Sequence, residues 1–167
     1  MSAAAVILTL VTIQRLAELA ISRRNTRRLM AQGAIELAPG HYPIIVAVHV
    51  SWLIALWTFG HDQPVNVIIL SVYLVLQGFR CWVMWTLGSR WTTRVIILPQ
   101  TQLVTTGPYR LLSHPNYAVV ICEIATLPLA LGLGWLAAIF TVVNAAGLAI
   151  RIRAENRALA RTGPSAS

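Results

Sequence analysis

The sequence contains no lysine and few charged residues of any kind. All 13 basic residues are arginines, the acidic residues number five, and charged residues make up 11% of the 167 positions. Hydrophobic residues make up 57%, and the mean hydropathy is +0.69. Soluble domains carry about 25% charged residues, so this composition excludes an ordinary soluble protein. It predicts a membrane protein.

Cysteine is also scarce. Cys81 and Cys122 stand in separate apolar runs without Cys-x-x-Cys spacing, which argues against a disulfide framework and a cysteine-based zinc site. We expect both to be packing residues, because free cysteine usually behaves as a small buried hydrophobe. No metal site is predicted. The first apolar run is followed by arginines and not by a small-residue cleavage site, so we expect a membrane anchor and not a signal peptide.

Five apolar segments can be read along the chain, and a spanning helix needs roughly 20 such residues because the bilayer core is about 30 Å thick. The segments cover residues 3–21, 43–60, 64–86, 117–133 and 135–150. Short connections at 60–64 and 132–134 predict two helical hairpins. The predicted fold class is therefore an all-α membrane bundle of about five transmembrane helices with a C-terminal cytoplasmic helix, forming one domain over residues 1–167.

The arginines occur mainly in the three longer connections, at 22–42, 87–116 and 151–167, whereas the two hairpin turns contain none. By the positive-inside rule these connections are cytoplasmic, which places the N-terminus outside and the C-terminus inside a bacterial inner membrane. Because the arginines flank membrane spans and do not cluster on one soluble surface, we expect membrane lipid as a partner and not nucleic acid.

Several polar residues fall inside the predicted spans, where ionised groups are costly and need partners. Glu123 and Arg80 are therefore expected to have partners inside the bundle. Arg15 and Glu18 stand three residues apart and are expected largely to satisfy each other in a structural role. We expect His49 to be an interior histidine whose ring has a hydrogen-bond partner.

A polar stretch stands immediately before the fourth span. It includes Gly107, Pro108, Tyr109 and Arg110, then His114, Pro115, Asn116 and Tyr117. Pro115 suits the first turn of a helix, and the residues before the two prolines are expected to be extended. The free N–H groups of such a helix start can receive a carboxylate. The same residues would also suit a simple helix cap at the membrane surface.

These two motifs, with Glu123 and with Arg151 and Glu155 in the C-terminal segment, resemble the isoprenylcysteine carboxyl methyltransferase family over about residues 64–160. The resemblance implies a pocket for S-adenosylmethionine, closed by the C-terminal helix. The cofactor-binding residues it implies are Gly107, Pro108, Tyr109, Arg110, His114, Pro115, Asn116, Tyr117, Glu123 and Glu155. One departure is Asn156, which stands where many relatives have a second acid.

Residues 18–25, 33–36, 41–43 and 91–95 are similar to a bacterial branch associated with type III polyketide synthases. That likeness implies O-methylation of alkylpyrones or alkylresorcinols, in place of an isoprenylcysteine-like carboxylate. Methyl transfer mainly requires alignment of donor and acceptor, with removal of at most one proton. The candidate catalytic residues are His114, Glu155, Arg151, Glu36 and His41. The candidate substrate-binding residues are Arg90, Trp91, Arg94, Trp85 and His49, although Trp85 and Trp91 would equally suit an interfacial aromatic belt.

Two other functions remain open from the sequence. Some sterol-reductase-like membrane reductases, which use NADPH, share the two motifs around Pro108 and Pro115, although so short a chain favours the smaller methyl donor. A non-enzymatic transporter or scaffold is the other alternative. Transporters often contain inverted repeats, and this sequence has no clear repeat.

Overall fold

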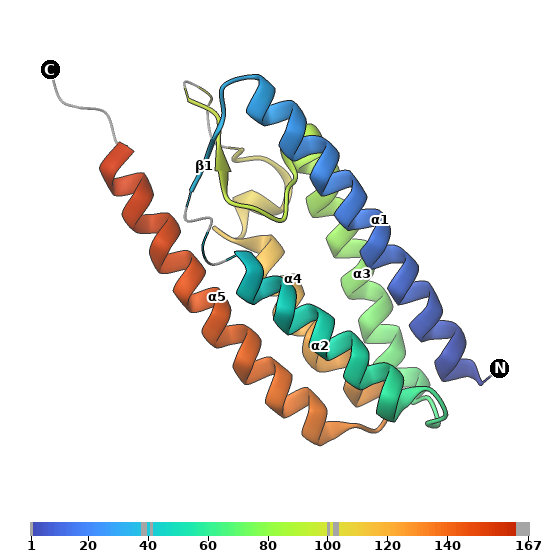
Figure 1. Ribbon diagram of the computed structural model, residues 1–167. Helices are drawn as coiled ribbons and strands as arrows, with labels where there is room; N and C mark the ends of the chain where they lie inside the picture. The colour runs from blue at the N-terminus through green and yellow to red at the C-terminus, as the bar shows by residue number, and fades with distance from the viewer. Residues whose placement is uncertain (1, 38–39, 41, 100, 102–103, 163–167) are drawn as a thin grey trace, which may run out of the picture.

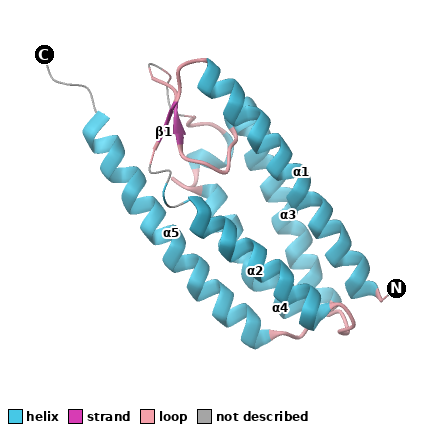
Figure 2. Cartoon of the chain, viewed as in Figure 1, coloured by secondary structure: helices cyan, strands magenta, loops and turns pink. Residues whose placement is uncertain are grey.

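The protein is an all-α bundle, as the sequence predicts, with one very small sheet (Figures 1 and 2). The computed structural model describes the chain apart from residues 1, 38–39, 41, 100, 102–103 and 163–167, and describes no side chain from residue 154 onward. The five α-helices are α1 (Ala3–Ala31), α2 (Tyr42–Gly60), α3 (Val67–Leu87), α4 (Pro115–Ala130) and α5 (Gly134–Thr162).

Four of these helices, α1, α2, α3 and α5, are long and apolar enough to cross a membrane. The remaining helix, α4, has 16 residues. At a rise of 1.5 Å per residue α4 is about 24 Å long, somewhat shorter than a bilayer core of about 30 Å. Helix α4 packs against both α3 and α5, and half of its residues are buried. The shortest helix is therefore an interior one.

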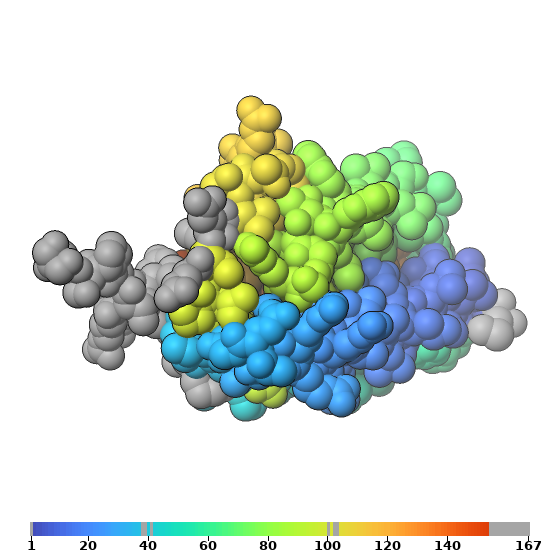
Figure 3. Space-filling model, turned by 90° about the horizontal axis from the view of Figure 1, so that it is seen from above, coloured from blue at the N-terminus to red at the C-terminus, as the bar shows by residue number. Residues whose placement is uncertain are grey.

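Helix α1 is longer than the apolar run that predicts it. The run ends near residue 21, whereas the helix continues through the arginine cluster to Ala31. Figure 3 shows α1 as a continuous ridge in blue along one side of the molecule. The extension carries Ser22, Asn25 and Leu29, all of them buried. A part of the chain that the hydropathy assigns to a connection is therefore a rigid wall of the bundle.

The two predicted hairpins lie at one end of the bundle, formed by residues 61–66 and 131–133, which we call the turn end. Asn66 begins α3 by accepting hydrogen bonds from the backbone N–H groups of Ile68 and Ile69 at 3.1 and 3.2 Å. Gly132 ends α4 with a φ of +72°, which lets the Leu133 N–H reach the Pro128 carbonyl at 2.8 Å. Glycine adopts this left-handed conformation without the steric cost that other residues incur.

Apolar side chains from all five helices form the core, with Leu8, Trp52, Leu127 and Leu136 among its most buried members. The prediction that the two cysteines are packing residues is wrong. Both Cys81 and Cys122 are free and exposed on the outside of the bundle. In a membrane protein apolar side chains on the outside contact lipid tails, so hydrophobicity does not separate interior from exterior positions.

The opposite end, which we call the loop end, consists of the described residues 32–37, 88–99, 101 and 104–114. Two short strands pair there, β1 (Ile35–Glu36) and β2 (Ile96–Ile97), in antiparallel register. The Leu37 N–H extends the pairing by donating to the Val95 carbonyl at 2.8 Å. Two 3₁₀ helices complete this end, η2 (Gly88–Arg90) and η3 (Gly107–Arg110). The loop end is thus an ordered cap over the bundle.

An ion network joins α1, α3 and α4 inside the bundle. We use "ion network" for Gln14, Arg15, Glu18, Gln77, Arg80 and Glu123. Arg80 donates to both carboxylate oxygens of Glu18 at 2.6 Å each and to Glu123 at 2.8 Å. Arg15 donates to Glu18 at 3.0 Å and to Glu123 at 2.9 Å. Two guanidinium groups face two carboxylates, so the network has no net charge.

The glutamines complete the hydrogen bonding of the ion network. Gln14 donates to Glu18 at 2.9 Å, and Gln77 donates to Glu123 at 2.8 Å. The expectation that Glu123 and Arg80 have partners inside the bundle is confirmed. Arg15 and Glu18 do pair within α1, but each also contacts another helix. The network therefore fixes the relative positions of three helices.

Candidate functional site

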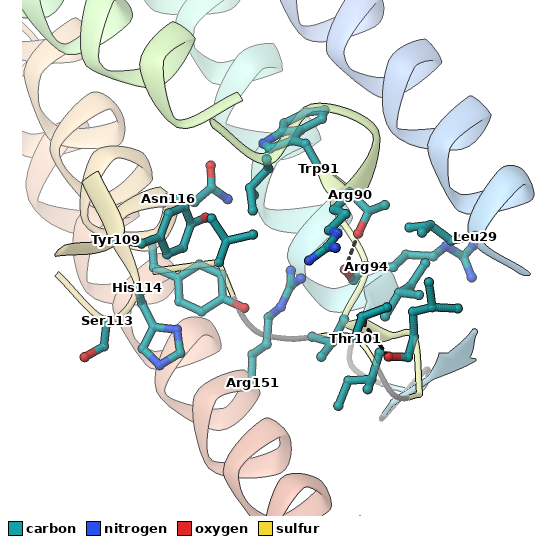
Figure 4. A pocket seen from close by; sticks show the side chains of 18 residues that line it. Leu29, Arg90, Trp91, Arg94, Thr101, Tyr109, Ser113, His114, Asn116 and Arg151 are labelled. Carbon is teal, nitrogen blue, oxygen red and sulfur yellow. Dashed lines mark hydrogen bonds between the residues drawn. The ribbon is translucent and has the colours of Figure 1, made fainter. Parts of the chain in front are cut away.

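A cavity of about 340 Å³ opens at the loop end, between the cap and the ends of the helices (Figure 4). Such a volume lies within the usual range for small-molecule sites, roughly 300–1,000 Å³. Its lining comes from α1, the end of α3, residues 90–98, η3, the start of α4 and α5. The lining residues are Leu29, Leu87, Arg90, Trp91, Thr92, Arg94, Val95, Ile96, Ile97, Leu98, Thr101, Val104, Tyr109, Ser113, His114, Asn116, Tyr117 and Arg151.

The first turn of α4 forms one wall. Pro115 is the first residue of α4, as predicted, and His114 precedes it without making a side-chain cap. The rings of His114 and Tyr117 stack with their centres 5.3 Å apart and their planes inclined by 15°. From α5, the guanidinium of Arg151 lies 5.3 Å from the centre of the Tyr117 ring, within cation–π range. The two motifs that flank the last hairpin in sequence therefore meet in the cavity.

The 3₁₀ helix η3 is held close to α3 at Gly107. The φ of Gly107 is +59°, so the prediction of an extended residue before Pro108 is wrong at this position. A Cβ at residue 107 would lie 2.7 Å from the hydroxyl oxygen of Thr86. Only glycine permits both the backbone conformation and the close approach. This contact sets where Tyr109, two residues later, enters the cavity lining.

The segment that follows η2 is anchored on α1. Asn25 donates from its side chain to the carbonyl oxygens of Trp91 at 2.8 Å and Gly88 at 3.3 Å. One turn earlier, the hydroxyl of Ser22 accepts from the backbone N–H of Thr93 at 2.8 Å. These bonds fix the backbone from which Arg90, Trp91 and Arg94 project. The extension of α1 beyond the apolar run thus has a direct role in shaping the cavity.

Arg94 lies at the edge of the cavity and is partly neutralised. Its guanidinium donates to the two carboxylate oxygens of Glu36 at 2.9 and 2.8 Å, and it covers the Tyr42 ring at 4.5 Å. The Tyr42 hydroxyl lies 3.2 Å from the hydroxyl of Thr93. Glu36 is therefore part of a hydrogen-bonded cluster that links β1, α2 and residues 93–94.

The cavity has a strongly cationic character. Its lining contains three arginines, one of which is paired with Glu36, and no carboxylate among the residues that the structure describes. In Figure 4 the side chains of Arg90 and Arg151 extend toward one another across the middle of the cavity. Such a site favours an anionic group. No group of three or more His, Cys, Asp or Glu side chains that could hold a metal ion is found in the described part of the chain.

The structure brings together eight of the predicted site residues. Those in the cavity lining are Arg90, Trp91, Arg94, Tyr109, His114, Asn116, Tyr117 and Arg151. Gly107, Pro108, Arg110 and Pro115 belong to η3 and to the start of α4 but not to the lining itself. Glu36 reaches the cavity only through Arg94.

The remaining predicted residues lie elsewhere. Glu123 belongs to the ion network, and His49 bonds through Nδ1 to the carbonyl of Ile45 in its own helix, at 2.8 Å. Trp85 is 87% exposed on the outside of α3, as an interfacial tryptophan would be. His41 and the side chain of Glu155 lie outside the described residues.

Sequence reasoning missed the apolar part of the lining. Leu29, Leu87 and Val104 contribute to it, together with the run 95–98. Nothing in their spacing separates them from membrane-facing residues. Ser22 and Asn25 were identifiable in principle, because two polar residues three positions apart on a helix share a face and need partners.

The chain is similar to proteins of one known family. The isoprenylcysteine carboxyl methyltransferase (ICMT) family model matches residues 67–161, more than half of the chain and nearly all of the cavity. The uncharacterized protein YpbQ of Bacillus subtilis is 39% identical over 158 residues, covering 92% of this chain and 94% of that protein. An uncharacterized protein of Haemophilus influenzae is 26% identical over 156 residues, covering 90% and 91%. No solved structure matches the chain. The chain belongs to the isoprenylcysteine carboxyl methyltransferase family, a family of membrane methyltransferases.

Proposed function

We propose that this chain uses S-adenosylmethionine to methylate an oxygen atom of a lipophilic acceptor at the cytoplasmic face of the bacterial inner membrane. One observation carries the proposal. The first turn of α4 and Arg151 of α5, which hold the motifs of the family, meet in a cationic cavity of about 340 Å³ at one end of a membrane bundle. The cavity thus combines cationic side chains with a position at one end of helices that can span a membrane.

The residues of the cavity fit the cofactor. Nε of Arg151 is buried and has no hydrogen-bond partner among the described residues, and it lines the cavity next to the start of α4. Because His114 makes no side-chain cap, this helix start also keeps its positive dipole end available. A carboxylate such as that of a methionine moiety would satisfy both features. When bound, S-adenosylmethionine supplies an electrophilic methyl group on a sulfonium.

Acceptor chemistry determines what the protein residues must do. A carboxylate acceptor needs no base, only arginines that orient it, and Arg90 and Arg94 lie on the same lining as Arg151. A phenol or an enol must lose a proton, and His114 is the candidate base within the described lining. Glu36 is a weaker candidate because Arg94 holds both of its carboxylate oxygens.

The acceptor's apolar part would contact the aliphatic side of the cavity, formed by Leu29, Leu87 and residues 95–98. This amphipathic lining supports alkylpyrones and alkylresorcinols, the acceptors that the polyketide-associated branch would imply, as well as isoprenylcysteine-like carboxylates. Each of these acceptors has an acidic oxygen attached to a long apolar chain. The proposal therefore specifies an acidic oxygen and a hydrocarbon tail.

The orientation follows from the arginines. Those of the loop end and its adjoining helix ends are Arg23, Arg24, Arg27, Arg28, Arg90, Arg94, Arg110, Arg151 and Arg153, whereas residues 61–66 and 131–133 at the turn end include none. We therefore assign the loop end and the cavity to the cytoplasmic side.

Binding and transfer measurements test the proposal. The protein, purified in detergent, is titrated calorimetrically with S-adenosylhomocysteine and separately with NADPH, and is then incubated with radiolabelled S-adenosylmethionine and a bacterial lipid extract. We expect S-adenosylhomocysteine to bind, NADPH not to bind, and the label to enter the lipid fraction. Binding of NADPH without S-adenosylhomocysteine would instead indicate a reductase, and absence of both binding and transfer would indicate a non-enzymatic role.

Two matched variants connect this activity with the cavity. Arg151→Met removes a guanidinium from the lining, and Arg153→Met makes the same change at an exposed position of α5. Loss of a charge-assisted hydrogen bond worth about 1.5–3 kcal/mol should weaken S-adenosylhomocysteine binding by about tenfold or more in the first variant. The second variant should bind as the unmodified protein does. Equal affinities in the two variants would contradict the assignment of Arg151.

A further inference from the structure

Four exposed arginines follow one another along the extension of α1, and we call them the arginine stripe. They are Arg23, Arg24, Arg27 and Arg28. At about 100° per residue they lie on the side of the helix opposite the buried Ser22, Asn25 and Leu29. Figure 3 shows this helix along the outside of the molecule. The inner side of the extension therefore holds the cap, and its outer side is a positively charged surface.

The protein offers the arginine stripe no counter-charge among its described side chains. The chain has five acidic residues. Glu18 and Glu123 are engaged in the ion network, and Arg94 holds both carboxylate oxygens of Glu36. Asp62 lies at the turn end, and the side chain of the fifth acidic residue is not described. No ion pair of the described residues involves the stripe.

The stripe also repels itself. Arg23 and Arg27 stand four residues apart, as do Arg24 and Arg28, and like charges at this spacing destabilise a helix. Nε of Arg27 donates to the Arg23 carbonyl at 3.4 Å, but this bond within the helix neutralises no charge. The negative dipole end of α1 favours cations only in the last turn, which contains Arg28. An anion from outside the protein would remove the repulsion.

The same side of α1 is apolar before the stripe begins. Its exposed side chains are those of Val6, Leu10, Ile13 and Leu16, which in a membrane contact lipid tails. The apolar run 3–21 is about 28 Å long, close to the bilayer core of about 30 Å. The stripe then extends for about 8 Å, and the headgroup layer on each side of the core is roughly 5–8 Å thick. The arginines thus lie at the depth of the lipid headgroups.

We propose that the arginine stripe binds the headgroup phosphate of an anionic phospholipid whose acyl chains lie along the exposed apolar side of α1. A phospholipid carries its anion and its hydrocarbon in the order in which the helix presents arginines and apolar side chains. Clusters of arginines next to a membrane span attract anionic lipids in this way. A free phosphate or a nucleic acid offers the anion without the hydrocarbon. The proposal does not depend on the methyl-transfer function.

A lipid competition on the unmodified protein tests the site. The full chain, purified in a neutral detergent, is mixed with equal amounts of phosphatidylglycerol and phosphatidylcholine that carry the same acyl chains. Native mass spectrometry counts the lipids of each kind that stay bound. Each arginine near an anionic headgroup contributes about fivefold in affinity, so we expect phosphatidylglycerol to be preferred about twentyfold or more. Equal binding of the two lipids would refute the site, whether or not any variant folds.

Two double variants remove the same charge from different places. Arg23→Gln with Arg27→Gln removes half of the stripe, whereas Arg110→Gln with Arg153→Gln removes two exposed arginines outside α1. The preference for phosphatidylglycerol should fall about twentyfold in the first variant and change by less than about twofold in the second. Circular dichroism verifies the helix content of both. Equal losses would mean that the lipid responds to net charge alone, which contradicts a site on α1.

Two soluble competitors identify the source of the anion. Glycerol 3-phosphate carries a phosphate without acyl chains, and a single-stranded oligonucleotide carries many phosphates. We expect neither to displace phosphatidylglycerol when its concentration equals that of the lipid. Displacement by glycerol 3-phosphate would indicate a site for free phosphate, and displacement by the oligonucleotide would indicate a nucleic-acid surface. Either result would overturn the lipid site.

Discussion

Glu123→Gln tests the ion network directly, because this substitution removes one of its two negative charges. The variant loses charge-assisted hydrogen bonds from Arg15 at 2.9 Å and from Arg80 at 2.8 Å. Each bond is worth about 1.5–3 kcal/mol, and breaking a buried pair costs about 3–5 kcal/mol in all. Glu123 is 1% exposed, so water cannot compensate for the charge left behind. We expect the free energy of unfolding to fall by about 3–5 kcal/mol.

A second substitution should restore much of this loss. Arg15→Gln combined with Glu123→Gln returns the net charge to zero and leaves Arg80 held by Glu18 through two contacts of 2.6 Å. The double variant should therefore be more stable than Glu123→Gln alone, with a coupling energy of about 2–3 kcal/mol. Asp62→Asn is the control. Its side chain is 76% exposed, so its stability should change by less than about 0.5 kcal/mol.

The measurement is equilibrium unfolding in mixed micelles, with dodecyl sulfate as the denaturant and tryptophan fluorescence as the signal. The six tryptophans of the chain provide that signal without labelling. A loss below about 1 kcal/mol in Glu123→Gln would refute the reasoning, since that is the range of exposed ion pairs. So would a double variant whose loss equals the sum of the single losses, because additivity means that the charges do not interact.

Three further substitutions test other parts of the structure. Gly107→Ala should weaken S-adenosylhomocysteine binding, because its Cβ would lie 2.7 Å from the Thr86 hydroxyl oxygen. Adding Thr86→Ala to the same chain should recover part of the affinity. If the affinity does not recover, the steric clash with Thr86 is not the cause. Asn25→Ala should reduce the affinity for S-adenosylhomocysteine without loss of helix content, since it removes the hydrogen bond to the Trp91 carbonyl. Calorimetry measures the affinity and circular dichroism measures the helix content. An unchanged affinity would argue against anchoring of Trp91 by Asn25. Asn144→Leu should raise the free energy of unfolding by about 1–2 kcal/mol in the micelle assay, because Asn144 is fully buried and its amide has no partner among the described residues. A lower free energy of unfolding would instead indicate that an enclosed water satisfies the amide.

The helices and their order were predictable because the apolar runs are long and the turns between them are short. The start of α4 at Pro115 was also predictable, because the preference of proline for the first helical position depends only on the local backbone. These features depend on neighbours in sequence. So does the Arg15 and Glu18 pair, which the spacing predicts and the structure contains.

Contacts between distant segments were not predictable in the same way. The ion network joins Glu18 to Arg80 and Glu123, and β1 pairs with β2 about 60 residues later in the chain. A single sequence shows that a buried charge needs a partner but not which helix provides it. The apolar cavity lining was hidden for another reason, because Leu87 has the same chemistry as a side chain that faces lipid.

The ion network also has a consequence for biosynthesis. During insertion the apolar part of α1 enters with Arg15 and Glu18 together, and their charges cancel, whereas α3 brings Arg80 as a single positive charge. An unpaired arginine at the centre of a helix costs about 2.5–3.5 kcal/mol on insertion scales. A nascent chain that ends between α3 and α4 therefore carries one excess positive charge in the membrane interior, and Glu123 cancels it. The arrival of α4 is thus the step that makes the ion network electrically neutral, and we expect chains truncated after α3 to be poorly retained in the membrane.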